Sequence, residues 1–401
     1  MKILYNGIFC ENGFVEEIKK GNGEIYPFAQ QKFEKLILSG IKFNNFNEDV
    51  TVLSTRPVIR YPKNKKIIMK KKQSKENGIN INYLSFINLP ILKQITIFFS
   101  IIKQILLWSK ENKKEEKKVI IYGTNPLNII PYLLLRKSKR YKIVSIVTEI
   151  DRLRLLEKRN IILKIKNYIY IKLSNIIEDR LDGYVLVCKN MNELINKRNK
   201  PYIVVEGMVT AENYDRNIQY MNKDNTIMYA GTLDKRYGIN KLVEAFEKIK
   251  DNKYKLLIYG NGDYKQELID KSKKNSSIIY GGVVSNNEII QQEKKAKILI
   301  NPRPSNEEFT RYSFPSKTLE YFSVGTVALI TRLEGIPDEY FKYCYVFENE
   351  DEEGFIKAIL SLINKPNEEL ENKAFEALNF VKKNKNNIVQ TKKILDFVEK
   401  I

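Results

Sequence analysis

Twelve short apolar runs recur along the chain, and a longer segment of mixed composition separates each run from the next. Short runs rich in Val and Ile are typical of buried parallel strands, and the intervening segments are long enough for connecting helices. The pattern therefore predicts an α/β fold with one parallel sheet in each half. The runs of the two halves begin at Lys2, Val50, Val119, Lys142, Tyr184 and Tyr202, and at Thr226, Tyr254, Ser277, Ile298, Val327 and Tyr345.

The chain of 401 residues is too long for one ordinary domain. A polar stretch over residues 210–225 separates the two sets of runs, which places the boundary near Asn213. We therefore predict two domains, over residues 1–212 and 213–401. The segment after Asn367 has helical spacing of its apolar residues, which predicts two closing helices. One of these packs back across the domain junction, or both cap the end.

Composition excludes several classes of site. The chain has no histidine, so the commonest general base and metal ligand are both missing. Its three scattered cysteines, Cys10, Cys188 and Cys344, indicate neither a disulfide framework nor a metal cluster. No apolar run reaches the roughly 18 to 20 residues that span a bilayer, and the first residues resemble a strand rather than a secretion signal. These features predict a cytoplasmic protein without a bound metal.

The positive charge is concentrated in the first half. Residues 1–200 contain 39 Lys and Arg against 18 Asp and Glu, which is a net charge of +21, whereas residues 201–401 contain 30 of each. This asymmetry favours an anionic partner, either a membrane surface, a nucleic acid or a phosphorylated substrate. The alternative is compositional drift towards Lys, Asn and Ile.

Two segments of the first half bear on that choice. Lys63–Lys75 is a dense basic run, typical of a solvated loop, and the scarcity of aromatic residues near it argues against nucleic acid. Leu89–Lys110 is apolar with regularly spaced Lys and Gln. It predicts a buried helix, or a helix at a membrane interface with its lysines towards the head groups.

Residues 303–338 place charged side chains where a helix between two strands begins. Helix starts offer unpaired N–H groups and a partial positive charge, to which Arg303, Arg311 and Lys317 add full charges. A diphosphate would suit this arrangement. Glu320, one turn later, can accept hydrogen bonds from the vicinal hydroxyls of a ribose. The alternative is a solvated loop with a helix cap.

Glycines follow several of the predicted strands. The first strand precedes a long loop with Gly21, Gly23 and Glu24. Gly231 directly follows a later strand, and Lys235 and Arg236 then precede a helix, so a basic group again meets a helix start. A further loop contains Gly260 and Gly262 but lacks the third glycine of a dinucleotide-binding fingerprint, which favours a tight turn.

The segments YAGTLDKRYGINKLVEAF, IYGNGDYK, IIYGGVV and FPSKTLEYFSVGTVALIT, in this order, resemble the C-terminal half of the family 4 glycosyltransferases of GT-B fold. The resemblance is specific over residues 226–365. It implies two Rossmann-like domains whose parallel sheets face across a cleft, with C-terminal helices closing the junction. It also implies retaining transfer without a metal, from a nucleotide-sugar donor held by the second domain to an acceptor held by the first. The expected donor is UDP-linked.

The resemblance also assigns residues. Glu320 matches the second glutamate of the Glu-x7-Glu signature, whose first glutamate is replaced by Tyr312. The glycine that lets the donor phosphates approach is matched by Gly231. The segment beside the base is matched by Gly282 and Val283. The remaining donor positions follow from the PSK-x-x-EY variant and its neighbouring cations, and are Arg303, Arg311, Ser316, Lys317, Lys235 and Arg236.

Lys317, Arg303, Lys235 or Arg236 is then expected to neutralise the leaving diphosphate. Glu149 or Asp151 would orient the acceptor hydroxyl, although Asp151 also suits a helix cap. We expect a cytoplasmic enzyme of surface polysaccharide synthesis, peripheral on the inner face of the membrane, that extends a lipid-linked glycan. A nucleotide-sugar epimerase and a non-catalytic basic adaptor are the alternatives.

Overall fold

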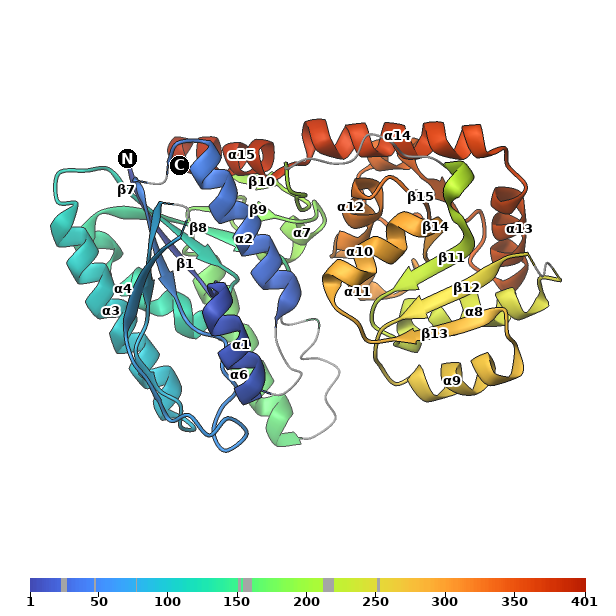
Figure 1. Cartoon of the computed structure of the whole chain (residues 1–401). Helices are drawn as coiled ribbons and strands as arrows, with labels where there is room; N and C mark the ends of the chain where they lie inside the picture. Colours follow the sequence, from blue (N-terminus) through green and yellow to red (C-terminus); the bar gives the residue numbers. More distant parts are fainter. Residues whose placement is uncertain are drawn as a thin grey trace. The chain divides into compact units, whose positions relative to one another are not determined.

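The structure, a computed structural model, describes residues 1–22, 27–46, 48–76, 78–150, 153, 161–211, 220–250 and 253–401 (Figure 1). The chain divides into two compact units. Unit 1 is Met1–Thr210 together with Asn387–Ile401, and unit 2 is Ala211–Asn386. The last helix thus belongs with the first unit, whereas the sequence-based division gave it to the second domain. The predicted boundary near Asn213 lies outside the described residues.

Unit 1 is built on a sheet with the strand order β10-β9-β8-β7-β1-β2-β5-β4, in which every neighbouring pair is parallel except β4 with β5. The strands are β1 (Lys2–Gly7), β2 (Val50–Ser54), β4 (Lys72–Glu76), β5 (Ile79–Tyr83), β7 (Lys117–Tyr122), β8 (Tyr141–Val147), β9 (Gly183–Leu186) and β10 (Tyr202–Val204). The strand order reverses between β1 and β7, as in doubly wound sheets. A ribbon of β3 (Ile68–Met69) and β6 (Phe86–Ile87) lies apart from this sheet.

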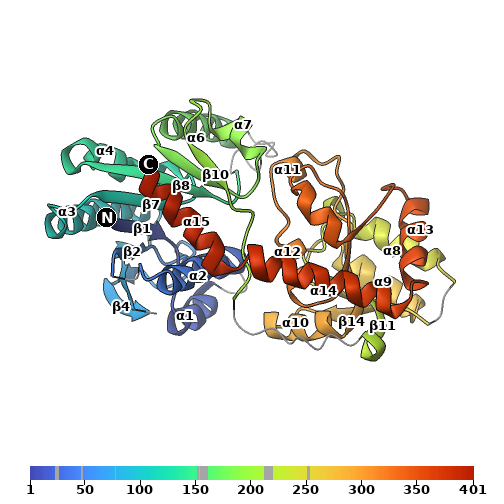
Figure 2. The same cartoon turned by 90° about the horizontal axis from the view of Figure 1, so that it is seen from above.

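Helices cover both faces of this sheet, because right-handed crossovers on either side of the reversal lead to opposite faces. One face carries α2, against which α15 packs, and the other carries the neighbouring helices α3, α4 and α6 (Figure 1 and Figure 2). The helices of the unit are α1 (Asn12–Asn22), α2 (Phe28–Phe43), α3 (Leu92–Glu111), α4 (Pro126–Lys139), α6 (Ile161–Glu178), α7 (Met191–Ile195) and α15 (Asn387–Lys400).

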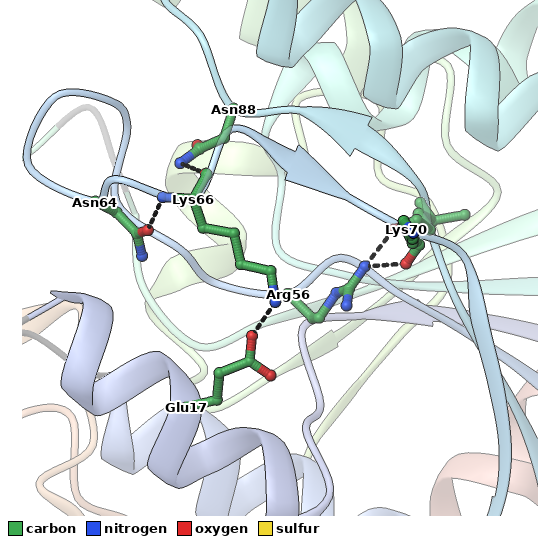
Figure 3. A network of polar contacts seen from close by, with 7 residues as sticks. Glu17, Arg56, Asn64, Lys66, Lys70 and Asn88 are labelled. Atoms are coloured by element: carbon green, nitrogen blue, oxygen red, sulfur yellow. Dashed lines mark hydrogen bonds and ion pairs between the residues drawn. The ribbon is translucent and has the colours of Figure 1, made fainter.

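The basic run Lys63–Lys75 was expected to be a solvated loop, but part of it forms strands β3 and β4. Side chains fix its start: Lys66 Nζ pairs with Glu17, and Asn88 Nδ2 donates to the carbonyl of Lys66 at 3.1 Å (Figure 3). Arg56 is buried and donates to the carbonyl of Lys70 (Figure 3). The β4 strand escaped the sequence pattern because an exposed edge strand needs few apolar residues.

Unit 2 contains a fully parallel sheet with the order β13-β12-β11-β14-β15-β16. The strands are β11 (Asp224–Ala230), β12 (Lys255–Tyr259), β13 (Ile278–Gly282), β14 (Ala296–Asn301), β15 (Val327–Ile330) and β16 (Tyr345–Val346). The helices are α8 (Ile239–Lys248), α9 (Lys265–Lys274), α10 (Asn286–Lys295), α11 (Glu308–Arg311), α12 (Ser316–Ser323), α13 (Glu352–Ile363) and α14 (Asn367–Asn384), with short 3-10 turns at Tyr220–Asn222, Lys235–Tyr237 and Asp338–Tyr343.

Hydrophobic spacing explains why these segments take these forms. Every residue of β14 is buried, as expected for a central parallel strand, and α8 buries one stripe that includes Ile239, Leu242 and Phe246. All twelve strands predicted from the sequence are present, and so are the two helices predicted after Asn367. Within the described ranges, no helix is long and apolar enough to cross a membrane.

Candidate active site

The reversal of strand order in unit 2 lies between β11 and β14, so the loops that follow these two strands diverge from the carboxyl edge of the sheet. Doubly wound sheets bind ligands at this position. The two loops touch: Gly238 has φ +75°, and a Cβ there would lie 2.1 Å from the carbonyl oxygen of Pro302. Only glycine fits this contact, because the backbone is left-handed and the space is already filled.

Gly231 is the first residue after β11, and the side chain of Lys317 lies against it. A Cβ at Gly231 would be 2.6 Å from Lys317 Cε. Lys317 Nζ lies 5.8 Å from the centre of the Tyr229 ring, within cation–π range. Among the described residues, Lys317 has no carboxylate within ion-pair distance. The glycine therefore lets a full positive charge approach the first turn of the loop.

Arg303 is the second cation at this edge. Its guanidinium lies 5.0 Å from the centre of the Tyr237 ring and 4.6 Å from that of Phe309. The two rings meet edge to face, 5.6 Å apart. Arg303 Nε is buried and has no hydrogen-bond partner in the described part of the chain, and burial lowers the pKa of the guanidinium. An anionic ligand would offset this loss of solvation.

The other three predicted donor cations already have carboxylate partners. Lys235 pairs with Glu267 at 2.7 Å and Arg236 with Asp234 at 2.8 Å. The side chain of Arg311 lies 3.1 Å from a carboxylate oxygen of Glu334. These three side chains are exposed, so their pairs contribute little to stability, but their charges are partly neutralised before any ligand arrives.

The helix α12 brings Ser316, Lys317 and Glu320 to the same edge. It begins after Pro315 without a side-chain cap, and the Thr318 N–H donates to the Pro315 carbonyl at 3.0 Å, so the N–H groups of Ser316 and Lys317 are the ones available to a ligand. Tyr321 is fully buried, and its hydroxyl donates to the carbonyl of Ile300 at 3.1 Å, which fixes the helix against β14. Glu320 is half-buried and follows Lys317 by one turn. Ser316 is exposed.

Two further donor positions lie at the end of β13. A Cβ at Gly282 would meet no atom within 4 Å, and Val283 is 67% exposed. This corner is therefore open to a flat ligand such as a base. Tyr312, at the position of the missing glutamate, ends α11, and its ring lies 5.6 Å from the guanidinium of Arg311.

The residues predicted for the acceptor lie in unit 1. Gly21 is in the last turn of α1 rather than in a loop, and a Cβ there would be 2.5 Å from Asn64 Nδ2. Glu149 is exposed after β8 and accepts a hydrogen bond from Gln30 Nε2 at 2.8 Å. Gly23, Glu24 and Asp151 lie outside the described residues.

Sequence reasoning missed Glu34, a buried carboxyl on α2. Its two oxygens lie 3.0 and 3.1 Å from the Ile8 nitrogen, which donates to them, and a Cβ at Gly7 would be 2.5 Å from Glu34 Oε2. Burial raises the pKa of Glu34 to about 8. The carboxyl supports the backbone that leaves β1 at the strand-order reversal of unit 1. The sequence does indicate that this carboxyl is buried, because Glu34 lies on the same helix face as the buried Ile37, Leu38 and Ile41.

The chain is similar to a known protein family over part of its length and to several solved structures. Residues 211–377 match the family described as glycosyl transferases group 1. A comparison with curated protein sequences finds no match. Sucrose-phosphate synthase from Thermosynechococcus elongatus superposes with a TM-score of 0.66 at 10% identity, covering 100% of this chain and 99% of that one. For Anabaena Alr3699/HepE in complex with UDP the values are 0.64 and 10%, with both chains fully covered.

A third solved structure, trehalose-6-phosphate from E. coli bound with UDP-2-fluoro glucose, gives a TM-score of 0.64 at 10% identity, covering 100% of this chain and 99% of that chain. These similarities show the GT-B fold over the whole chain. The family match covers residues 211–377, so this part of the chain is similar to the glycosyl transferases group 1.

Proposed function

With the group 1 glycosyltransferase domain as premise, we propose that the protein is a retaining enzyme of surface polysaccharide synthesis. It moves a sugar from a UDP-linked donor to a lipid-linked glycan, without a bound metal. The UDP assignment is supported by the solved structures of similar fold, two of which contain UDP or a UDP sugar. The basic first half of the chain supports an acceptor held at an anionic membrane surface.

The observation that carries the donor assignment is the pair of cations at the strand-order reversal. Lys317 lies against Gly231, and Arg303 lies against two aromatic rings that contact each other, and neither has a carboxylate partner in the described residues. Both cations stabilise the diphosphate as the anomeric bond breaks. The exposed first turn of α12 at Ser316 donates N–H groups to the same anion.

The remaining donor contacts follow from the chemistry of each position. Glu320 accepts hydrogen bonds from the ribose hydroxyls, and Gly282 with Val283 leaves room for the base. Lys235, Arg236 and Arg311 act as a secondary set, because each must first leave its carboxylate partner.

Proton transfer in this proposal does not require histidine. In a front-face mechanism the leaving phosphate oxygen takes the proton of the acceptor hydroxyl as the new glycosidic bond forms. Glu149 or Asp151 orients that hydroxyl, and the segment with Gly21, Gly23 and Glu24 contributes to acceptor binding.

A thermal-shift panel of nucleotides and nucleotide sugars tests the donor, followed by product analysis with and without acceptor. A ligand at 100 times its dissociation constant should stabilise the donor-binding state by about 2.7 kcal/mol. We expect UDP compounds to stabilise, and a sugar product to appear only with acceptor. Stabilisation by another nucleotide alone would overturn the UDP assignment. A changed sugar formed from donor alone would indicate an epimerase instead.

A further inference from the structure

One face of helix α3 is apolar although it is exposed. Its inner face buries Ile101 and Trp108 against the sheet. The opposite face carries a stripe that should be polar in an ordinary surface helix. Its members are Leu92, Ile95, Phe99 and Leu106, which are 42%, 45%, 63% and 42% exposed.

Specific contacts hold α3 in the orientation that exposes this stripe. Thr96 Oγ1 accepts a hydrogen bond from the Ile87 nitrogen at 3.0 Å, which ties the first turn of α3 to β6. Lys93 is turned inwards, where its ammonium donates to the carbonyl of Val58 and lies 5.4 Å from the centre of the Phe86 ring. The helix therefore cannot rotate to bury its outer face without breaking these contacts.

Exposed apolar side chains also lie on the neighbouring helices α4 and α6. Helix α4 packs between α3 and α6, and all three cover the same face of the sheet (Figure 1). The exposed apolar side chains on α4 and α6 are Leu127 (41%), Leu134 (63%), Tyr168 (67%), Ile169 (61%) and Ile176 (44%). Exposed apolar side chains gathered on three neighbouring helices of one layer indicate an interaction site rather than ordinary solvent exposure.

The charges in these helices identify the kind of partner. In sequence, α3, α4 and α6 contain nine Lys and Arg and two Glu, although Lys93 is turned inwards and Arg136 pairs with Asp182. Glu178 is buried, so Glu111 is the only exposed acid of the three helices. Lys103 and Lys110 lie at helical spacing from Phe99 and Leu106, within the same outward stripe. Lysines that flank inserted apolar side chains suit an anionic lipid surface, to which their ammonium groups extend.

The surface also reaches the edge where the acceptor is expected. Helix α3 begins shortly after β5 and β6, at the carboxyl edge of the unit 1 sheet. There Ile91 is 76% exposed and Ile68 is 64% exposed. A bilayer at this surface would lie beside the edge that we assign to the acceptor.

We propose that the outer layer formed by α3, α4 and α6 is a docking surface for an anionic lipid bilayer. The inference rests on the proposed function in one respect, since it explains how a lipid-linked acceptor reaches unit 1. The apolar side chains enter the head-group region, and the lysines contact the anionic head groups.

The test is sedimentation of the full-length protein with vesicles of phosphatidylcholine, with and without about one third phosphatidylglycerol. The double variant Phe99→Ser/Leu134→Ser removes two exposed apolar side chains. The matched control is Phe375→Ser, which changes a 46% exposed phenylalanine on α14 in unit 2. Wild type and control should bind the anionic vesicles, and the double variant should bind them about tenfold more weakly or worse.

A second variant, Lys103→Glu/Lys110→Glu, should weaken binding to anionic vesicles and leave weak binding to neutral vesicles unchanged. Thermal unfolding and the UDP-induced thermal shift report folding and donor binding independently of the membrane. If all variants keep both properties and bind vesicles as wild type does, the docking surface is wrong while the proposed function stands. A concentration-dependent dimer that Phe99→Ser/Leu134→Ser abolishes would equally overturn it, because the surface would then bind a second copy.

Discussion

At the residue scale, local partners decide which cations remain available to the donor. Five basic side chains were predicted near the nucleotide, and spacing in the sequence cannot rank them. The structure ranks them, because Lys235, Arg236 and Arg311 have carboxylate partners, whereas Lys317 and Arg303 have no ion-pair partner in the described residues. Lys317 lies against Gly231, the first residue after β11, and Arg303 is the second residue after β14, so both belong to the strand-order reversal.

Replacing Lys317 by alanine should therefore reduce kcat/KM at least tenfold, which is about 1.4 kcal/mol of transition-state stabilisation. The reason is that the positive charge of Lys317 stabilises the negative charge of the leaving diphosphate. Steady-state transfer assays provide the measurement. Lys235→Ala is the matched control, since it removes an exposed lysine already paired with Glu267, and should change kcat/KM less than about threefold. Equal losses in the two variants would contradict the ranking.

Local sequence signals can propose residues for this candidate site, but not the residues that surround them. Gly231, Lys317 and Glu320 could be proposed because helix starts and strand ends have local signals. Tyr237 and Phe309, which hold Arg303, come from separate segments that meet only in the folded unit. No local pattern reports such a contact.

At the element scale, strands buried on both faces were predictable and the edge of the unit 1 sheet was not. Strand β4 has the sequence KQSKE, and β5 has ININY, in which the polar residues point to one face only. Neither provides the continuous apolar run that identifies a central strand. Helix α1 was likewise missed, so Gly21 was predicted to lie in a loop.

The buried Glu34 on α2 should make stability depend on pH. Burial raises the pKa of its carboxyl from 4.5 to about 8, so the folded state binds a proton that the unfolded state has released. The contribution of Glu34 to the free energy of unfolding is fully present below about pH 4.5. It is lost as the pH rises to about 8, by up to about 1.4 kcal/mol per pH unit.

Urea unfolding at a series of pH values measures this dependence. The glutamine of Glu34→Gln cannot ionise. The free energy of unfolding of the wild type should therefore fall relative to that of the variant as the pH rises above about 4.5, and the difference should level off above about pH 8. A constant difference between pH 5 and pH 8 would show that Glu34 does not titrate in that range.

At the scale of the whole molecule, the C-terminal helix α15 belongs to unit 1, which also contains the N-terminus. The C-terminal segment reads as two closing helices in sequence, but sequence alone left open where each one packs. In the structure α15 packs on α2, and Gln390 Nε2 donates to the carbonyl of Gly207 at 2.9 Å. Unit 1 is thus assembled from both ends of the chain, a long-range contact that no local pattern specifies.

Ile394, which is buried on α15, should therefore support unit 1. Ile394→Ala should lower the free energy of unfolding of unit 1 by about 2 to 5 kcal/mol, because it leaves a cavity against α2. Lys392→Ala, on the exposed side of the same helix, is the control and should have a small effect. Hydrogen exchange of the amides of α2 distinguishes the result from a change in unit 2. If protection were lost in unit 2 and kept in α2, the assignment of α15 would be wrong.

The central claim is that Lys317 and Arg303 bind the donor diphosphate, and calorimetric titration of UDP tests it most directly. Charged hydrogen bonds contribute about 1.5 to 3 kcal/mol each, so Lys317→Ala/Arg303→Ala should weaken UDP binding about hundredfold or more relative to wild type. Uridine, which lacks phosphate, should show no comparable difference between the two proteins. Equal affinity of UDP for wild type and the double variant would contradict the claim.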